Sequence, residues 1–408
     1  MTKLKFTSAT LLAILGLQPA VGLSESATSV SEMLSEGSTS LNFRYRYELV
    51  DQDGVANNAN ASTLKSRLTY KTAEYNGLTG VLEVDNVTVV GDEKYKTPTN
   101  GLSGYPIVAD PDGTDLNQLS LAYKADDFIA TLGRQRILHG GQRFVGGVGF
   151  RQNEQTYDAF SLATKSLGSW AVNYSYIWDV NRIFGPDDNS AVQAKAWESD
   201  SHIILASTSL AKGQGIKAYA YLLDFDHAVN PDAPRANSTK TLGVEYSGKF
   251  DGFNLKAAYA TQSEYADNSS SYDADYLMAE ITWPLKPAKV SLGYEVLGSD
   301  DGAAAFKTPL ATLHKFQGWA DMFLGTPPNG VEDSYVKLAG KVGPAKVAVF
   351  YHDFSADFGG DDLGTEFDLV VTYPIKKGLS AQLKYADYNA GTHKTDTEKV
   401  WFTINAKY

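Results

Sequence analysis

The chain has no cysteine among its 408 residues, which excludes a disulfide framework, a thiolate metal site and a cysteine nucleophile. Its histidines lack the HxH or HxxxH spacing of zinc sites, and the sequence has neither a GxSxG motif nor a phosphate-binding glycine loop. The six histidines are His139, His202, His227, His314, His352 and His393. We therefore expect no catalytic residues, no metal ion and no cofactor.

Long hydrophobic runs are also missing. A membrane-spanning helix needs ~20 apolar residues, and the apolar run at residues 11–17 (LLAILGL) is far shorter. It follows a basic start and precedes the small residues Ala20 and Gly22, which is the pattern of a cleaved secretory signal peptide. We predict a signal peptide over residues 1–22 and an exported chain that begins at Leu23.

Basic residues are fewer than acidic ones, with 36 Lys and Arg against 48 Asp and Glu and a net charge of -12. Because an acidic chain of this size is a poor nucleic-acid binder, we expect no nucleic-acid partner. Aspartate pairs lie in polar stretches that we expect to be loops, at 187–188, 300–301 and 361–362. No EF-hand spacing supports a calcium site there.

Aromatic residues, in contrast, are abundant, with 24 Tyr, 18 Phe and 6 Trp. Tyrosine-rich girdles at the two membrane interfaces are typical of transmembrane β-barrels. A secreted lectin or β-sandwich enzyme has a similar composition, so composition alone leaves these classes open.

Alternation of apolar and polar residues with period two predicts eighteen strands in the mature chain. They cover residues 39–50, 62–75, 77–90, 115–125, 127–137, 154–164, 169–179, 198–211, 214–226, 238–249, 252–265, 272–284, 287–298, 332–343, 345–356, 362–374, 378–390 and 396–408. Tight turns and longer polar loops alternate between them. The turns include 76–77, 126–127, 251–252, 343–344 and 376–378, and the longer loops include 91–114, 138–153, 180–197 and 299–331. Short turns at one end and long loops at the other, with an even number of strands, are typical of bacterial outer-membrane barrels.

The last predicted strand has the pattern of a strand between lipid and a lumen. Its apolar face holds Val400, Phe402, Ile404, Ala406 and Tyr408, its polar face holds Lys399, Thr403, Asn405 and Lys407, and Trp401 breaks the alternation. Lipid offers no hydrogen bonds, so such strands must close into a barrel. A terminal aromatic residue after an apolar alternation is typical of the signal that the barrel-assembly machinery recognises.

We therefore predict an all-β fold, a transmembrane antiparallel β-barrel of eighteen strands over residues 39–408. Residues 23–38 are a polar lead-in, interpreted as a periplasmic tail or short helix. The predicted location is the outer membrane of a Gram-negative bacterium, in contact with lipid and lipopolysaccharide.

Several basic residues of the first strands share the face opposite the apolar one. These inward residues are Arg44, Arg46, Lys65, Arg67 and Lys124. One interpretation is structural, with Glu83, Asp85, Glu366 and Asp368 as ion-pair partners. The other is functional, because surplus positive charge attracts anions into a pore.

The segment from residue 131 to 160 is rich in glycine and carries four arginines, namely Arg134, Arg136, Arg143 and Arg151. Glycine allows a loop to fold tightly, and arginine binds carboxylates with a planar fork. A loop folded into the pore here would form an arginine constriction. The alternation of an unbroken strand would turn Arg134 and Arg136 toward lipid, unless Gly133 forms a bulge or the strand ends there.

Two blocks resemble the alginate export porin family of outer-membrane barrels. The first comprises residues 134–160, particularly Gly133-Arg134-Gln135 and Arg151-Gln152-Asn153-Glu154-Gln155, and the second comprises residues 310–321 (LATLHKFQGWAD). Elsewhere the resemblance lies in strand number alone. It implies an eighteen-stranded barrel with an electropositive, arginine-rich lumen that passes alginate. It does not settle the direction of transport, the substrate or a periplasmic export partner.

The longest loop, residues 299–331, has its own pattern. Thr308 followed by Pro309 is typical of a helix start, and apolar residues then recur at helical spacing up to Ala320. A helix here would either plug the pore or stabilise the rim of the barrel. We interpret His314 as a packed or hydrogen-bonding histidine and not as a ligand.

The sequence thus predicts a channel for anionic saccharides, with alginate or oligouronates as the first candidates. The residues proposed to line the pore and bind substrate are Arg44, Arg46, Lys65, Arg67, Lys124, Arg134, Arg136, Arg143 and Arg151. One alternative is a general or small-solute porin whose basic groups are structural. An outer-membrane enzyme or adhesin is the alternative from another class.

Overall fold

The computed structural model describes residues 26–187 and 194–408, so the predicted signal peptide lies outside the described residues. In this part of the chain, eighteen long strands form one antiparallel sheet, as predicted. The first nine are β1 (Ser38–Gln52), β2 (Ala59–Lys71), β3 (Leu78–Val89), β4 (Gly113–Lys124), β5 (Phe128–Gln135), β6 (Thr156–Leu167), β7 (Trp170–Asn181), β8 (Ala196–Ala211) and β9 (Gln214–Leu223). The others are β11 (Thr239–Lys249), β12 (Asn254–Glu264), β13 (Asp273–Trp283), β14 (Ala288–Leu297), β17 (Val331–Val342), β18 (Ala345–Ser355), β19 (Asp362–Lys376), β20 (Leu379–Ala390) and β21 (Thr397–Lys407).

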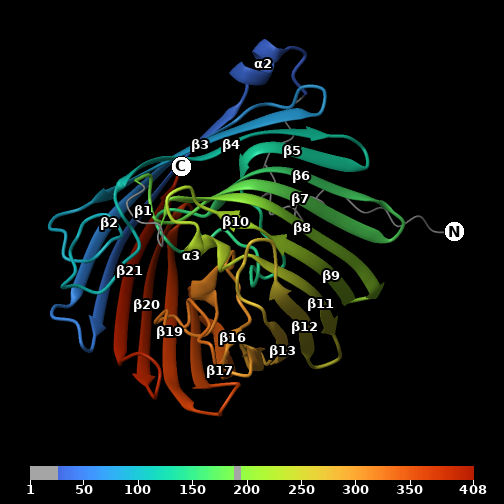
Figure 1. Cartoon of the computed structure of the whole chain (residues 1–408). Coiled ribbons are helices and arrows are strands. Elements are labelled where there is room, and N and C mark those ends of the chain that lie inside the picture. Colours follow the sequence, from blue (N-terminus) through green and yellow to red (C-terminus); the bar gives the residue numbers. More distant parts are fainter. Residues whose placement is uncertain (1–25, 188–193) are drawn as a thin grey trace.

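The sheet closes because its first and last strands pair. β1 and β21 run antiparallel in unbroken register from Asn42 opposite Lys407 to Gln52 opposite Thr397, and they lie side by side in Figure 1. Closure gives each edge strand a hydrogen-bonding partner, which a strand in lipid requires. No helix of the described residues is long and apolar enough to cross a bilayer.

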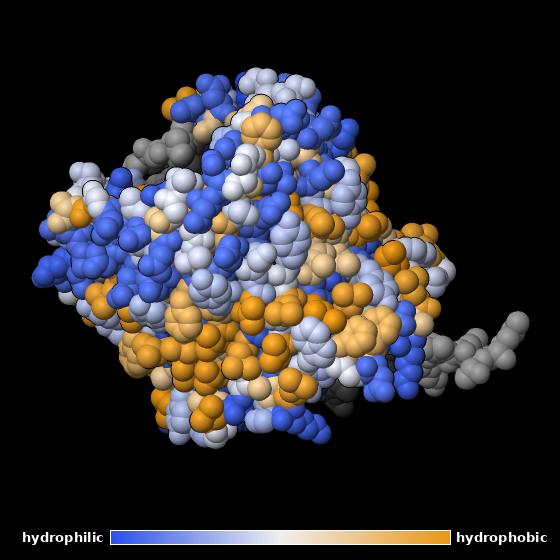
Figure 2. Space-filling model, turned by 90° about the horizontal axis from the view of Figure 1, so that it is seen from below, coloured by the Kyte–Doolittle hydropathy of each residue, from blue (hydrophilic) through white to orange (hydrophobic). Residues whose placement is uncertain are grey.

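Apolar side chains cover the outer face of the wall. The exposed ones include Leu68, Leu82, Leu119, Leu121, Leu132, Leu242, Val244, Leu277, Leu292, Val336, Leu338 and Leu383. In Figure 2 hydrophobic side chains gather into one broad area that adjoins a strongly hydrophilic one. Trp401 is buried between inward Lys399 and Thr403, so this residue follows the inward side of the strand. Period two therefore separates a lipid face from a lumen face.

The strands are joined by tight turns at one end of the barrel. Asn76 and Gly77 between β2 and β3 both have positive φ, 49° and 84°, as a two-residue hairpin of this twist requires. By analogy with bacterial barrels this is the periplasmic end. The described part of the lead-in lies there, because Ala27 N–H donates to Glu74 O (2.8 Å) and Ala73 N–H donates to Met33 O (3.0 Å).

The lead-in forms a short helix, α2 (Val30–Ser35), which bears out one of its two predicted forms. Ser29 is its N-cap and accepts from Glu32 N–H (3.2 Å), while the Glu32 carboxylate accepts from Thr28 N–H (2.7 Å). These reciprocal hydrogen bonds resemble a capping box and satisfy N–H groups that a helix start leaves free.

Short elements occupy the long connections at the other end. They are β10 (Phe225–Asp226), α3 (Asp232–Arg235), β15 (Ser299–Asp300), β16 (Ala304–Ala305) and the 3₁₀ turn η1 (Leu313–Lys315). We name three connections for use below: the first loop (residues 90–112), the arginine loop (residues 136–155) and the long loop (residues 298–330).

Candidate functional site

The arginine loop folds into the lumen. Tyr157, an inward and fully buried residue of β6, donates through its hydroxyl to Gly146 O (2.7 Å). Phe144 packs against inward Tyr219 and Tyr276, with ring centroids 5.2 and 5.1 Å away. Aromatic side chains of β9 and β13 thus hold the loop against the wall.

The arginine loop and the long loop interlock inside the barrel. Gly146 N–H donates to Leu310 O (2.8 Å), and Thr312 N–H donates to Gln142 O (3.0 Å). A Cβ at Gly146 would lie 2.3 Å from Thr312 Oγ1. Glycine is needed here because the two backbones approach so closely.

The helix predicted from Thr308 to Ala320 is wrong. Only η1 (Leu313–Lys315) is helical, and Val145 and Leu310 form an isolated parallel β-bridge at the start of the predicted segment. Gln317 and Gly318 then adopt positive φ of 48° and 76°, which a right-handed helix excludes. The apolar spacing reflects packing of an irregular loop against the arginine loop and the wall.

Arg143 joins the arginine loop to the opposite wall. Its guanidinium is buried and donates to Glu295 Oε1 of β14 (2.6 Å), Thr308 Oγ1 (3.2 Å) and Gln317 Oε1 (3.1 Å). Tyr276 also donates to this Glu295 oxygen (2.6 Å). The charge of Arg143 is therefore compensated within the protein.

Arg151 occupies a second buried network. It pairs with Glu48 of β1 (3.0 Å) and with Asp321 of the long loop (3.1 Å). Asp110 of the first loop lies 3.7 Å from Arg151 and accepts from Gln152 N–H (2.7 Å). Three loops and the wall thus meet at one guanidinium.

His314 is a packed and hydrogen-bonded histidine, as interpreted from the sequence. It stacks on Phe150 with ring centroids 3.5 Å apart. Burial is the main cause that lowers its pKa well below the usual value, which favours neutral imidazole. In the neutral ring Nδ1–H can donate to Asp321 (2.7 Å), while Nε2 accepts from the Lys384 ammonium (2.5 Å).

Glu154 of the arginine loop collects three inward cations. It accepts from Arg67 (2.9 Å) and Arg136 (2.6 Å), and Lys65 lies 3.8 Å away. Burial acts against the ionised form, yet the coulombic effects of Arg136 and Arg67 hold the pKa of Glu154 well below its usual range. Arg67 also forms a bidentate pair with Asp85 (2.6 and 2.5 Å).

Arg44 and Arg46 of β1 bind the backbone of the arginine loop. Arg44 donates to Gln152 Oε1 and Gly149 O, both at 2.8 Å, and to Arg151 O. Arg46 donates to Phe150 O (2.6 Å) and lies 3.8 Å from Asp110. Among the described residues, no carboxylate lies within 4.0 Å of Arg44, so neutral acceptors satisfy its donors without compensating its charge.

Arg134 and Lys124 do not join this group. The β5 register is unbroken through Gly133, so the bulge is not formed, and Arg134 lies opposite outward Leu119 and Asp158. Its guanidinium pairs with Asp158 (2.7 and 2.9 Å). Lys124 is exposed at the end of β4. β5 ends at Gln135, which lets Arg136 turn inward to Glu154 and Glu83.

The Glu366 carboxylate fastens the long loop to the wall. It accepts from the backbone N–H groups of Trp319 and Ala320 (2.7 Å for Ala320). A Cβ at Gly318 would lie 2.2 Å from this carboxylate. Glu366 was predicted as an ion-pair partner for the basic wall, and the structure instead places it under a loop backbone.

A group of lysines was missed in the sequence. Lys256, Lys289 and Lys337 point inward from β12, β14 and β17, and Lys315 of η1 approaches them from the long loop. Burial lowers the pKa of Lys315, and the nearby charges of Lys256 and Lys337 lower it further. We call these four residues the lysine group.

Carboxylates are scarce around the lysine group. Lys256 lies 3.9 Å from Glu280, but among the described residues no carboxylate lies within 4.0 Å of Lys289, Lys315 or Lys337. Lys315 donates to Gly141 O (2.8 Å), and Lys337 lies over the Phe350 ring (4.8 Å). The short turns on either side of β14 and β17 place this group toward the periplasmic end of the lumen.

Comparison with known proteins agrees with this geometry. Residues 36–310 match the family model described as alginate export. The chain belongs to the alginate export family. Among curated proteins none matches this alginate export family member. The first block of resemblance lies inside the matched region, whereas nearly all of the second, residues 310–321, lies beyond it.

Solved porins share the fold of this alginate export family member. OccAB4 of Acinetobacter baumannii is 15% identical with a TM-score of 0.69, and the match covers 91% of this chain and 98% of that one. OccK9 (OpdG) of Pseudomonas aeruginosa is 14% identical with a TM-score of 0.70, and the match covers 92% and 99%. These structures support the fold, and membership of the alginate export family makes the chain an outer-membrane β-barrel of a Gram-negative bacterium and a channel for solutes.

Proposed function

We propose that this channel conducts anionic saccharides, with alginate or shorter oligouronates as the first candidates, and that the lysine group sets its preference for anions. The observation that carries this proposal is the difference in pairing between four lumen arginines and three members of the lysine group. Arg67, Arg136, Arg143 and Arg151 each bind a carboxylate at 3.1 Å or less. Lys289, Lys315 and Lys337 have none within 4.0 Å among the described residues.

Pairing decides which cations attract a solute. A guanidinium beside a carboxylate contributes little field at a distance, because the two charges cancel. An unpaired ammonium in a narrow, low-dielectric passage attracts anions and focuses them. Each uronate carries one carboxylate, so several separated lysines offer weak, exchangeable contacts, and conduction requires binding loose enough for release.

The predicted pore-lining arginines have a second role in this proposal. They line the constriction and fix the loops that shape it, with Lys65 beside them. Lys124, at the end of β4, and Arg134, near the end of β5, lie outside the constriction, so each contributes charge to the rim of the barrel at its own end. A periplasmic export partner and recognition by the barrel-assembly machinery stay predictions.

Reversal potentials in planar bilayers under a KCl gradient test the proposal. We expect anion preference in the wild type and its loss in a variant that combines Lys289→Gln, Lys315→Gln and Lys337→Gln. The matched control replaces Lys240, Lys376 and Lys377 by Gln, because it removes the same charge from residues exposed outside the lumen. Cation preference in the wild type, or equal selectivity in the two triple variants, would overturn the proposal.

Two alternatives predict different results in the same experiment. In a general or small-solute porin the basic groups are structural, so neither variant changes selectivity and oligouronates do not block the current. An outer-membrane enzyme or adhesin gives no conductance at all. The pairing of the arginines supports a structural role for them. The experiment therefore changes the lysines, which have no close carboxylate among the described residues.

A further inference from the structure

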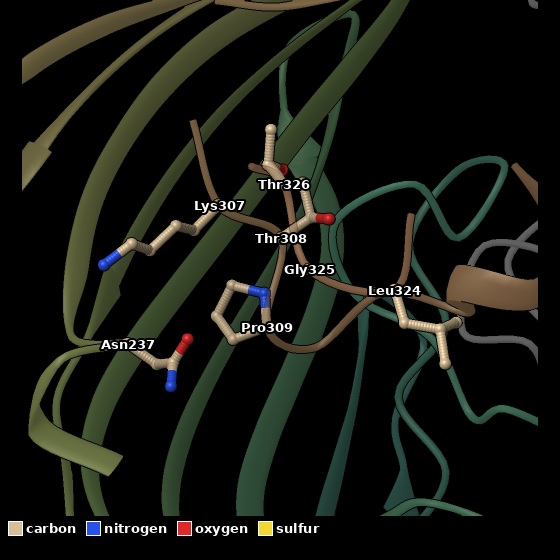
Figure 3. A pocket seen from close by; sticks show the side chains of 7 residues that line it. All are labelled: Asn237, Lys307, Thr308, Pro309, Leu324, Gly325 and Thr326. Atoms are coloured by element: carbon tan, nitrogen blue, oxygen red, sulfur yellow. The ribbon is translucent and has the colours of Figure 1, made fainter. Parts of the chain in front are cut away.

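A small cavity opens between the α3 turn and the long loop, at the end of the barrel opposite the tight turns. Its volume is about 190 Å³, and seven residues from the two segments line it (Figure 3). They are Asn237, Lys307, Thr308, Pro309, Leu324, Gly325 and Thr326. The cavity lies on the extracellular side, because the long connections of bacterial barrels face outward.

Lys307 brings an uncompensated positive charge to this cavity. Its ammonium donates to Ala236 O (2.6 Å) and lies 5.5 Å from the centre of the Tyr272 ring. Burial lowers the pKa of Lys307, and among the described residues no carboxylate lies within 4.0 Å. An ammonium has three donors, so two are left for a ligand.

The other lining residues suit a sugar. Asn237 donates to Ala233 O (2.9 Å), which leaves its carbonyl oxygen to accept from a hydroxyl. Pro309 and Leu324 provide apolar surface, and in Figure 3 the proline ring lies between Lys307 and Leu324. A Cβ at Gly325 would meet nothing within 4 Å, so the space in front of this glycine is open.

The cavity is also connected to the constriction. Thr308 Oγ1 accepts from Arg143 (3.2 Å), which lies deeper in the lumen. The same loop continues from Lys307 to Lys315 of the lysine group.

We propose that this cavity is a capture site for one carboxylated sugar residue at the extracellular mouth of the channel, with Lys307 binding the carboxylate. The inference rests on the proposed conduction of anionic saccharides and deepens it by placing the first contact at the extracellular mouth. Pro309 contacts the apolar face of the sugar ring, and Asn237 accepts from a ring hydroxyl.

Current block by a uronic acid trimer tests the site. In oriented single channels, Lys307→Gln should weaken block by trimer added on the extracellular side about tenfold, the effect of losing one charge-assisted hydrogen bond. Block from the periplasmic side should change little. The neutral trisaccharide maltotriose should bind weakly to both proteins, because it has no carboxylate.

Two further variants separate the site from general effects. Gly325→Val fills the open space without changing any charge, so it should also weaken extracellular block. Lys240→Gln removes an exposed lysine outside the lumen and should leave block unchanged. Unaltered block in both Lys307→Gln and Gly325→Val overturns the site, and so does a loss of equal size from both sides of the membrane.

Failure of this site and failure of the proposed function give different results. If the wild type prefers anions but the trimer blocks the Lys307→Gln and Gly325→Val channels as it blocks the wild type, the capture site is wrong and the channel function stands. If the wild type lacks anion preference and trimer block still depends on Lys307, the site binds the sugar and the selectivity proposal is wrong.

Discussion

The two sides of the lumen carry the same sign of charge in different ways. On the side of β1 to β3 and the arginine loop, guanidinium groups are buried in carboxylate networks centred on Glu154, Glu48 and Asp110. On the side of β12 to β17, Arg143 pairs with Glu295, but in the lysine group only Lys256 has a carboxylate within 4.0 Å among the described residues. The paired arginines fix the shape of the lumen, whereas the lysine group keeps the charge that the proposed selectivity requires.

The choice of residue type fits this division. Arginine is always charged and makes several directed hydrogen bonds, so it suits buried, multidentate pairing. Lysine is a compact charge on a flexible stem, so it suits brief contacts with passing carboxylates. A residue's type alone does not show which role it has, because Lys65 and Lys384 lie buried among partners on the structural side.

Arg143→Ala should produce the largest effect on stability. It leaves the buried Glu295 carboxylate without its cation, and breaking such a buried pair costs about 3–5 kcal/mol. Thr308 and Gln317 lose a hydrogen-bond partner as well. The free energy of unfolding from lipid vesicles in urea, followed by tryptophan fluorescence, measures this cost.

Lys337→Gln, in the lysine group, is the matched control for that measurement. We expect a cost below about 1 kcal/mol, because an unpaired, partly exposed ammonium contributes little to stability. Equal destabilisation by the two substitutions would erase the distinction between paired, structural cations and the cations of the lysine group.

Acid should destabilise the arginine loop through His139. Burial lowers the pKa of this histidine to about 4, with a further contribution from the charge of Lys217. In the unfolded chain the histidine titrates near 6.5. Above that pH the ring is neutral in both states and the folded protein keeps its full stability. As the pH falls toward 4, the unfolded state binds the proton first, and the free energy of unfolding decreases. The expected loss is about 3 kcal/mol, measured as the difference in unfolding free energy between pH 7 and pH 4.

The His139→Gln variant shows how much of that loss belongs to this side chain. Glutamine cannot titrate, so the variant should keep only the part of the acid sensitivity that carboxylates cause. If wild type and variant respond to acid identically, His139 is not the group that links the loop to pH.

Much of the fold was predictable from the sequence because period two and turn chemistry are local. Every strand repeats them, and Asn76-Gly77 marks a hairpin by itself. Contacts inside the lumen are different in kind. Arg143 and Glu295 are 152 positions apart, and alternation shows that both point inward without showing that they meet.

The same limit explains the missed lysines and the wrong helix. Lys256, Lys289 and Lys337 are far apart in sequence, whereas four arginines cluster visibly between 134 and 151. The apolar spacing after Pro309 resembled that of a helix. In the structure Gln317 and Gly318 have left-handed backbone conformations, and the next two backbone N–H groups donate to Glu366. Tertiary contacts decided both cases.

Glu366→Ala should loosen the long loop with a moderate effect. The backbone N–H groups of Trp319 and Ala320 lose their acceptor, and an unsatisfied buried donor costs about 1–3 kcal/mol. Glu366→Gln is the matched control, since an amide oxygen can accept the same hydrogen bonds. We expect larger current fluctuations in single channels of the alanine variant alone. Quiet channels in that variant would show that the loop is held by its arginine contacts.

The smallest expected effect is the pH dependence of selectivity on the lysine side. Burial and the neighbouring charges of Lys256 and Lys337 lower the pKa of Lys315. The ammonium is present below that pKa and is lost as the pH rises through it, so anion preference should begin to fall before the ordinary lysine value of about 10.4. Reversal potentials between pH 7 and 11 measure this decline, and Lys315→Gln should lack its early part. Because the paired guanidinium groups keep their charge in this range, a decline of the same shape in both proteins would assign selectivity to other residues.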